Sequence, residues 1–266
     1  MGFKNLIRNK ILDYGYYVQR TPSASLIKSR ISKFKINTNI QKKFSYDRFG
    51  STFDGGYVIP LDFEGIDLCL SAGVENRIDF ESSLYDKTGI QCDLIDGSMS
   101  KFENLPTFAN FTSINLGPTN TKKTISLKNW IRKFDQFDEF ILQCDIEGHE
   151  YDVFLSTQEE YIKRLRIIIL EIHNVFNIFS NDENNNVDKL MSKLLITHSL
   201  LHVHCNNCSD ILDNKLLTLT NSLELTFIRN DRIHKKKNKK PISSNPSNFD
   251  KPNNPNIKNI NFKIKF

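Results

Sequence analysis

Acidic residues are concentrated in the segment Asp145–Glu150, which directly follows the apolar run Phe140–Cys144. Three carboxylates within six residues are costly at the end of a buried strand unless they serve a site. The dipole of a following helix favours acids in its first turn, and this accounts for Glu150 better than for Asp145. We therefore expect Asp145 to be the main catalytic residue, Glu147 to be a second candidate, and Glu150 to belong to the helix end.

His173 and Asn174 follow the apolar run Ile167–Leu170, from which Glu171 and Ile172 separate them. The carboxyl ends of neighbouring parallel strands meet at one edge of a sheet, so His173 would lie beside Asp145. Such a carboxylate–imidazole pair can orient a general base. Together with Asn174, the same two residues could instead hold a divalent metal ion. We favour the base over the metal site; the plainest alternative is a histidine that is only hydrogen bonded within the fold.

Two other apolar runs end in residues that suit a nucleoside. Ser71, Ala72 and Gly73 form a small-residue turn, which lets a ligand approach the backbone and exposes the first amides of the next helix. Asp96 directly follows the next apolar run, Gln91–Ile95. It lies roughly 20 residues after the glycine, where an acid can accept both ribose hydroxyls. Each feature alone fits an ordinary strand–helix turn, but together they predict nucleoside binding.

These polar residues follow short apolar runs that alternate with helix-like segments from residue 48 onward. Strands separated by helices predict an α/β fold with a mostly parallel, seven-stranded sheet flanked by helices. No clear helix separates the last two runs, which predicts an antiparallel strand at one edge. The apolar runs are 66–71, 91–95, 110–116, 139–144, 166–172, 200–204 and 222–228. The helix-like segments are 79–88, 126–134, 148–157 and 184–197, with Ser126 as an N-cap.

Positive charge is concentrated at both ends of the chain. Eleven Lys and Arg against two Asp give residues 1–50 a net charge of +9, and ten against two give residues 231–266 a net charge of +8. Because the whole chain carries +5, residues 51–230 carry −12. An acidic body argues against a nucleic-acid-binding protein. The basic ends could touch an anionic membrane surface or carrier lipid, or be only solvated.

The two ends also differ from the body in pattern. Phe3, Leu6, Ile7 and Ile11 stand at helical spacing and predict an amphipathic helix, followed by a second basic, weakly helical segment up to about residue 45. Residues 235–266 are rich in Asn, Lys and Pro, a composition that predicts a disordered tail. The sequence shows no signal peptide and no apolar run long enough to span a membrane. We expect a cytoplasmic protein, with peripheral contact of its basic ends to the inner membrane face as an option.

These motifs together resemble the FkbM-type methyltransferases, a branch of the class I, Rossmann-like enzymes, over about residues 48 to 230. Their order and spacing are more specific than any one of them. The matching motifs are Asp54-Gly55-Gly56-Tyr57-Val58, Ser71-x-Gly73 leading to Phe80-Glu81, Asp96, Asp145-Ile146-Glu147-Gly148-x-Glu150, Glu171-Ile172-His173, His204-x-Asn206-Asn207 and Leu223–Phe227. The tail segment Phe249–Asn253 also looks like a C-terminal element of such proteins, in contrast to its disorder-like composition.

The resemblance implies S-adenosylmethionine as the methyl donor and, commonly, a hydroxyl on a sugar or small metabolite as the acceptor. Its coverage implies a Rossmann-like methyltransferase domain at 48–230, and the charge and composition of the ends add a basic helical extension at 1–47 and a basic Asn/Lys/Pro-rich segment at 231–266. One departure is that Glu75, Asn76 and Arg77 stand where relatives often carry a glycine and paired acids. The residues that we expect to bind the donor are Asp54, Gly55, Tyr57, Ser71, Ala72, Gly73, Glu81, Asp96 and Asp145, with the turn at 54–57 as part of a lid.

We expect an O-methyltransferase that acts on a sugar hydroxyl in a surface polysaccharide or glycolipid precursor, with Asp145 and His173 on the acceptor side. One alternative is a small-metabolite O-methyltransferase that uses a divalent metal ion, because catechol-type methyltransferases hold Mg²⁺ at the same two strand ends. Another is a non-catalytic binding protein at a membrane surface. A nucleic-acid methyltransferase is disfavoured, because base-amine methyltransferases carry a Pro-Pro-aromatic motif where this chain has the acidic segment beginning at Asp145.

Overall fold

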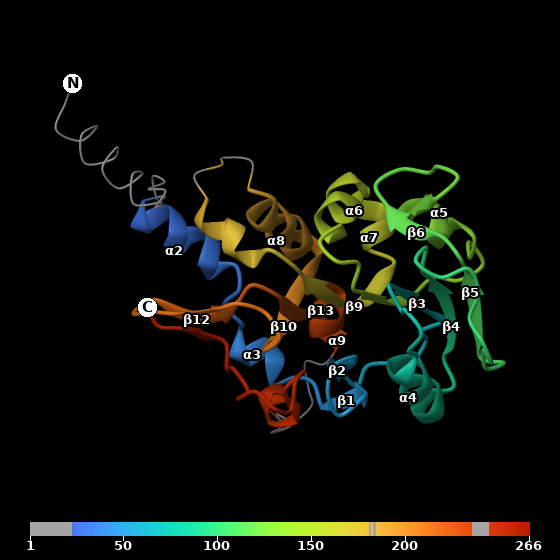
Figure 1. The fold of residues 1–266 in the computed structure, drawn as a ribbon, viewed down its shortest axis with the longest axis horizontal. Helices are drawn as coiled ribbons and strands as arrows, with labels where there is room; N and C mark the ends of the chain where they lie inside the picture. Colours follow the sequence, from blue (N-terminus) through green and yellow to red (C-terminus); the bar gives the residue numbers. More distant parts are fainter. Residues whose placement is uncertain (1–22, 181, 183–184, 236–244) are drawn as a thin grey trace.

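The computed structural model describes residues 23–180, 182, 185–235 and 245–266 (Figure 1). The expected amphipathic helix from Phe3 to Ile11 lies outside the described residues. No helix in the described ranges is both long and apolar enough to cross a membrane.

A seven-stranded sheet forms the centre of the molecule, with the strand order β10-β13-β9-β8-β3-β4-β5. Four neighbouring pairs, from β9 to β5, are parallel, whereas β13 is antiparallel to both β9 and β10. The α/β architecture and the antiparallel excursion near one edge are confirmed, and the sheet as a whole is mixed. Its strands are β3 (Leu68–Ala72), β4 (Gln91–Ile95), β5 (Ala109–Thr112), β8 (Phe140–Cys144), β9 (Leu165–Ile172), β10 (His198–Cys205) and β13 (Leu223–Arg229).

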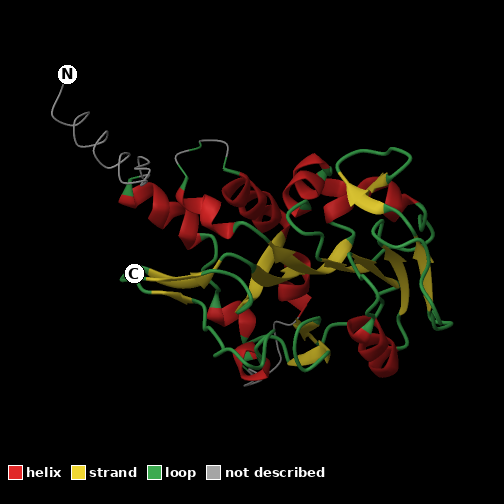
Figure 2. Ribbon diagram, viewed as in Figure 1, coloured by secondary structure: helices red, strands yellow, loops and turns green. Residues whose placement is uncertain are grey.

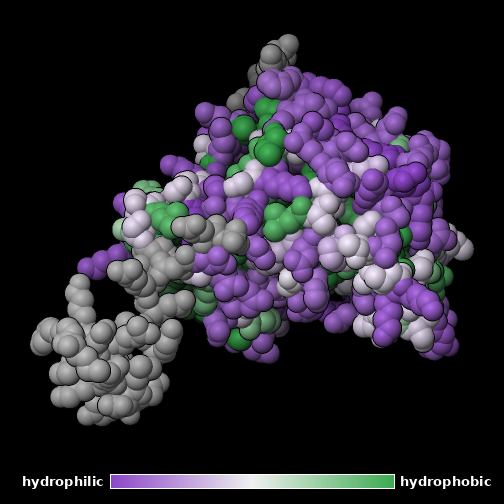
Figure 3. All heavy atoms as spheres, turned by 90° about the horizontal axis from the view of Figure 1, so that it is seen from above, coloured by the Kyte–Doolittle hydropathy of each residue, from purple (hydrophilic) through white to green (hydrophobic). Residues whose placement is uncertain are grey.

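Helices cover both faces of this sheet (Figures 1 and 2). One face carries α2, α5, α6, α7 and α8, and the other carries α3, α4 and the β1–β2 hairpin. The face seen from above is mainly hydrophilic with small, separate apolar spots, as expected for the outer sides of amphipathic helices (Figure 3). The helices are α2 (Ala24–Ser32), α3 (Thr38–Gln41), α4 (Asp79–Thr88), α5 (Leu127–Arg132), α6 (Glu150–Ser156), α7 (Glu159–Ile162), α8 (Asn186–Thr197) and α9 (Asn230–Lys235), with 3-10 turns η1 (Val175–Phe179) and η2 (Pro246–Phe249).

Two apolar cores lie on the two faces of the sheet because successive side chains of a strand point in opposite directions. In β8, Leu142 packs into the core that contains α5, α6 and α8, and its neighbour Ile141 packs into the core that contains α4 and the hairpin. All four predicted helices are present, and Ser126 caps α5 by accepting a hydrogen bond from the Asn129 N–H at 3.3 Å. The sheet edge that carries the polar residues is therefore supported from both sides.

One expected strand, 110–116, is divided in the structure. The strand β5 ends at Thr112, and the next residues form β6 (Asn115–Gly117), which pairs with β7 (Thr124–Ser126) in a separate sheet. Because β6 leaves the main sheet, Asn115 comes close to the residues that follow β4, and its Oδ1 accepts a hydrogen bond from the Gly97 N–H at 3.1 Å.

An antiparallel hairpin that the sequence patterns did not predict, β1 (Tyr46–Gly50) and β2 (Gly56–Pro60), precedes the main sheet. Its loop is tight: a Cβ added to Gly56 would lie 2.1 Å from the Ser51 carbonyl oxygen. Arg48 holds the loop from inside by donating to the Ser51 carbonyl at 3.0 Å and to the Phe53 carbonyl at 2.7 Å. The hairpin thereby fixes the loop that carries the Asp54–Tyr57 motif.

The composition-based prediction of a disordered tail is wrong for residues 245–266. The strand β14 (Lys263–Ile264) pairs with β12 (Leu217–Thr220), which in turn pairs with β11 (Ile211–Asp213). Asparagine-rich composition does not reveal specific contacts such as that of Asn253, whose amide group donates to the buried Glu224. The proposed division into an extension, a central domain and a C-terminal segment stays a prediction.

Candidate active site

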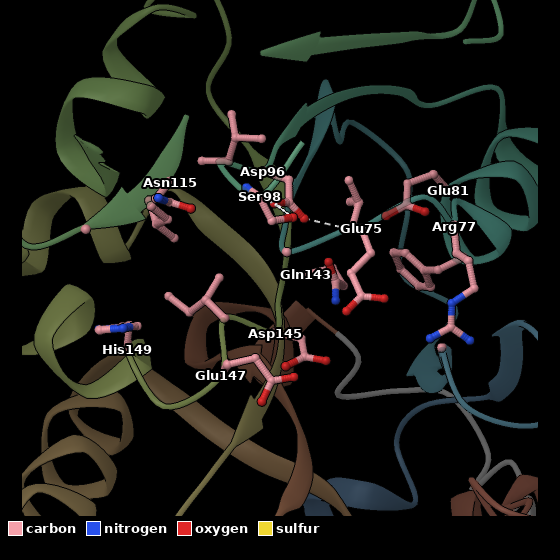
Figure 4. A pocket seen from close by; sticks show the side chains of 18 of the residues that line it. Glu75, Arg77, Glu81, Asp96, Ser98, Asn115, Gln143, Asp145, Glu147 and His149 are labelled. Carbon is pink, nitrogen blue, oxygen red and sulfur yellow. Dashed lines mark hydrogen bonds between the residues drawn. The ribbon is translucent and has the colours of Figure 1, made fainter. Parts of the chain in front are cut away.

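A cavity of about 700 Å³ opens at the carboxyl edge of the sheet (Figure 4). Seven of the nine residues expected to bind the donor line it: Asp54, Gly55, Tyr57, Gly73, Glu81, Asp96 and Asp145. The other two, Ser71 and Ala72, are buried inside β3. In Figure 4, Asp145 and Glu147 lie together on one side of the cavity, with Asp96 and Ser98 across from them.

Gly73 brings two walls of this cavity together. It has a positive φ of +79°, and a Cβ at this position would lie 1.6 Å from the carbonyl oxygen of Asp145. Any side chain would therefore force apart the turn after β3 and the segment after β8. The single glycine that made this turn a weak nucleotide motif is required here by a close backbone approach.

Asp96 is fixed by three hydrogen bonds on the turn that surrounds it. Its Oδ2 accepts from the Glu75 N–H at 2.7 Å, and its Oδ1 accepts from the Ser98 N–H at 2.8 Å and hydroxyl at 2.6 Å. Glu75 has a positive φ of 47°, a conformation that non-glycine residues adopt mainly at constrained sites. The carboxylate thus lines the cavity in a set orientation, as a ribose-binding acid requires.

A buried polar chain forms the floor of the cavity. The Ser71 hydroxyl lies within hydrogen-bonding reach of both the Glu81 carboxyl group and Gln143 Oε1, the latter at 2.6 Å. Gln143 Nε2 donates to the Tyr57 hydroxyl at 3.3 Å. Burial raises the pKa of Glu81 to about 7, so this group changes charge near neutral pH. Gln143 was not predicted; its signal is a lone amide within the apolar run of β8.

Asp145, Glu147 and His173 come together beside the cavity. His173 Nε2 lies 3.9 Å from Asp145 Oδ1 and 3.5 Å from Glu147 Oε2. One ligand atom from each of the three residues falls within 4.8 Å of the others, so this set could hold a metal ion. Asn174, the third residue expected at a metal site, is exposed, and its ligand role stays a prediction. The structure brings together the expected pair, Asp145 and His173, with Glu147 beside them.

Glu150 begins α6, as the sequence suggested, but its side chain also has partners in the preceding loop. Its side chain is fully buried, with 0% exposure, and its Oε1 accepts from the Ile146 and Gly148 N–H groups at 3.0 and 3.1 Å. The same oxygen lies 3.3 Å from His173 Nδ1. Glu150 lies in the first turn of α6, where the helix dipole favours an acid, and its carboxylate also bonds to the loop before the helix. Glu150 therefore shapes the acidic loop and orients the imidazole so that its Nε2 faces Asp145.

A second buried carboxylate, Glu171, lies behind His173. Its Oε1 accepts from Asn206 Nδ2 at 2.8 Å and from the Ser222 hydroxyl at 2.6 Å, and it lies 3.8 Å from His173 Nε2. These contacts bring the motifs that contain Glu171 and Asn206 together at the ends of β9 and β10. Burial raises the pKa of Glu171, although both hydrogen bonds oppose the shift.

Electrostatics at this cluster favour a bound cation. Burial raises the pKa of Asp145 to about 9, and the neighbouring Glu171 carboxylate adds to the shift. Burial alone would lower the pKa of His173, but the hydrogen bond to Glu150 and the surrounding carboxylates outweigh it and raise the value to about 9. Asp145 and His173 thus hold protons that a cation beside them would displace.

Replacing Glu150 with Gln tests whether this buried carboxylate sets the protonation of His173. The Glu150→Gln side chain keeps an oxygen for the two loop N–H groups but loses the negative charge beside the imidazole. We expect the pKa of His173 to fall from about 9 toward its ordinary value of 6.5. An NMR titration of the imidazole protons measures it, with the exposed His149 as the internal control. A His173 pKa that stays near 9 in the variant would contradict this role.

The comparisons with known proteins agree with this geometry. The family model described as the Methyltransferase FkbM domain matches residues 56–197, from β2 to α8, and so includes Gly73, Asp96, Asp145 and His173. No curated protein matches the chain. The large mixed sheet flanked by helices is consistent with a methyltransferase fold. Because the matched region covers more than half of the sequence, this chain belongs to the FkbM methyltransferase family.

Proposed function

We propose that this protein is an S-adenosylmethionine-dependent O-methyltransferase of the class I, Rossmann-like type. One observation carries the proposal: Asp96, suited to a ribose, and Asp145, paired with His173, follow different strands and open onto the same cavity. Its volume of about 700 Å³ is in the usual range for small-molecule sites. Donor and acceptor could therefore meet within one enclosure, which methyl transfer requires.

The donor is assigned to the cavity by its chemistry. Its ribose would bind Asp96, and its methionine end would extend toward Asp54, Tyr57 and Glu81. Arg77 also lines the cavity, and we assign it to the donor's carboxylate because guanidinium groups bind carboxylates in a bidentate manner. This role gives a purpose to the position where the chain departs from the common family pattern.

The acceptor side consists of Asp145 and His173. S-adenosylmethionine would supply the methyl group from its sulfonium. The methyl carbon would bond to the acceptor oxygen in line with its bond to sulfur, which breaks and releases S-adenosylhomocysteine. Asp145 and His173 orient the acceptor hydroxyl and take up its proton as the new oxygen–carbon bond forms. A cation beside them favours an ionised carboxylate and a neutral imidazole, so donor binding prepares the pair to accept that proton.

The acceptor that we propose is a sugar hydroxyl in a surface polysaccharide or glycolipid precursor. The residues that line the cavity include eight acids and, of Arg and Lys, Arg77 alone. Such a lining favours uncharged polyhydroxyl acceptors over anionic ones. A cytoplasmic location, with the basic ends near the inner membrane face, is part of the same proposal and is supported by the charge of residues 1–50 and 231–266.

Donor affinity tests the assignment of Asp96. We expect S-adenosylmethionine to bind the wild-type chain with a Kd of roughly tens of micromolar or lower, and the Asp96→Ala variant at least ~10-fold more weakly, because hydrogen bonds to a charged group are lost. Isothermal titration calorimetry gives both values. Asp86→Ala, an exposed acid on the outside of α4, is the matched control and should bind as wild type. A wild-type chain that binds no donor would overturn the proposed function.

Turnover tests the roles of Asp145 and His173. We expect Asp145→Asn and His173→Ala each to lower turnover by about 100-fold or more, the range of general acid–base catalysis, with donor affinity nearly unchanged. S-adenosylhomocysteine release with a panel of sugar acceptors measures the rate. His234→Ala, an exposed histidine on α9, should keep wild-type activity. Near-normal turnover in both site variants would show that proton removal does not depend on this pair. Donor binding without turnover in the wild-type chain would favour the non-catalytic alternative.

The second candidate is a metal-assisted O-methyltransferase of small metabolites, favoured by the cluster of Asp145, Glu147 and His173. Glu150 on the opposite imidazole nitrogen resembles the carboxylate that commonly supports a histidine ligand. Neutral His173 would supply one ligand and the two carboxylates the others, and the ion would stabilise an acceptor alkoxide.

Chelation distinguishes the two candidates. We expect EDTA to leave turnover unchanged, because the donor's sulfonium already supplies positive charge beside the carboxylates. Activity that requires added Mg²⁺ or Mn²⁺, together with Mn²⁺ binding that is lost in Glu147→Gln by electron paramagnetic resonance, would establish the metal-assisted reaction instead.

A further inference from the structure

The C-terminal segment lies outside the region that the family model matches, and it contacts Asp54 at the edge of the cavity. Its 3-10 turn η2 packs beside β1, β2 and β10, where the red end of the chain meets the blue hairpin (Figure 1). Asp250 Oδ1 accepts from His202 Nε2 at 2.7 Å and lies 3.6 Å from His204 Nδ1. Although burial opposes it, these two histidines lower the pKa of Asp250 to about 2, so the anchor stays charged at neutral pH.

A second anchor holds the segment at Asn254, four residues after Asp250. Asn207 is buried and holds the segment from both of its polar groups: its Nδ2 donates to the Asn254 and Ile257 carbonyls, each at 3.0 Å, and its Oδ1 accepts from the Asn254 N–H at 2.8 Å. Asn253, which lies between Asp250 and Asn254, is thereby fixed in position.

Asn253 connects this fixed segment to the cavity. It is 5% exposed, and its Nδ2 donates to Glu224 Oε1 at 2.6 Å and to Asp54 Oδ1 at 3.2 Å. The other oxygen of Asp54 accepts from Arg77 Nη2 at 2.9 Å. Asp54 lines the cavity and stands on the hairpin loop, so the chain of contacts runs from β13 through the tail to the cavity mouth.

We propose that Asn253 is a positioning residue that holds the Asp54 carboxylate toward the amino group of the methyl donor. This inference rests on the proposed donor site. When the donor's carboxylate takes Arg77, Asp54 loses that partner and is retained by Asn253. Asp54 then faces the donor's ammonium group. The Arg77–Asp54 ion pair of the free protein is thereby replaced by two pairs, Arg77 with the donor's carboxylate and Asp54 with its ammonium group.

The test compares two ligands that differ at the methionine end. S-adenosylhomocysteine carries the amino-acid group, whereas 5′-methylthioadenosine lacks it. We expect Asn253→Ala to weaken S-adenosylhomocysteine about 10-fold, the usual effect of losing a hydrogen bond to a charged group, and to change 5′-methylthioadenosine less than about 2-fold. Asn256→Ala, an exposed asparagine of the same segment, is the matched control and should change neither.

A double-mutant cycle with Asp54→Ala separates positioning from general destabilisation. We expect Asn253→Ala to have no further effect on S-adenosylhomocysteine affinity once Asp54 is absent. Equal weakening of both ligands, unchanged affinity for both, or full additivity with Asp54→Ala would overturn the inference while leaving the proposed function intact. A wild-type chain that binds neither ligand would overturn both.

Discussion

The close packing of the ends of β3 and β8 is the constraint on which the site depends. Ala72 pairs with Cys144 in parallel register, and the Asp145 N–H continues the ladder by donating to the Ala72 carbonyl at 3.1 Å. Gly73, which directly follows β3, leaves the space that the Asp145 carbonyl occupies. The turn suited to the donor and the acids suited to the acceptor consequently lie across a single cavity. A side chain at Gly73 would separate them.

Unbalanced negative charge is the second general property of the cavity. Eight acids line it, and burial raises the pKa of Asp145 and of Glu81 into the neutral range or above. Holding such groups together is costly unless an occupant supplies positive charge. A donor with a sulfonium and an ammonium group meets this requirement. Asn253 holds the Asp54 carboxylate, and Glu150 holds the loop that carries Asp145 and Glu147.

Local patterns in the sequence predicted the sheet and the four helices α4, α5, α6 and α8, because apolar runs mark buried strands. They also predicted the pairing of Asp145 with His173, because the ends of parallel strands converge. The contacts that were missed join distant residues. The Asp250–His202 pair spans 48 positions, and composition alone suggested disorder there. Glu150 was assigned by its place in the first helical turn, but the loop amides that it binds become apparent only when the chain folds. The β1–β2 hairpin was not predicted, because β1 mixes polar and apolar residues without a clear apolar run.

The most direct test of the central claim is to locate the methyl group of the bound donor. NMR with S-adenosylmethionine labelled with ¹³C in its methyl group reports nuclear Overhauser contacts from that carbon's protons to the protein. The account predicts contacts to cavity residues next to the acidic cluster, such as Ile146 and Tyr57, both of which line the cavity. Contacts only to another surface, or no bound signal at millimolar donor, would contradict it.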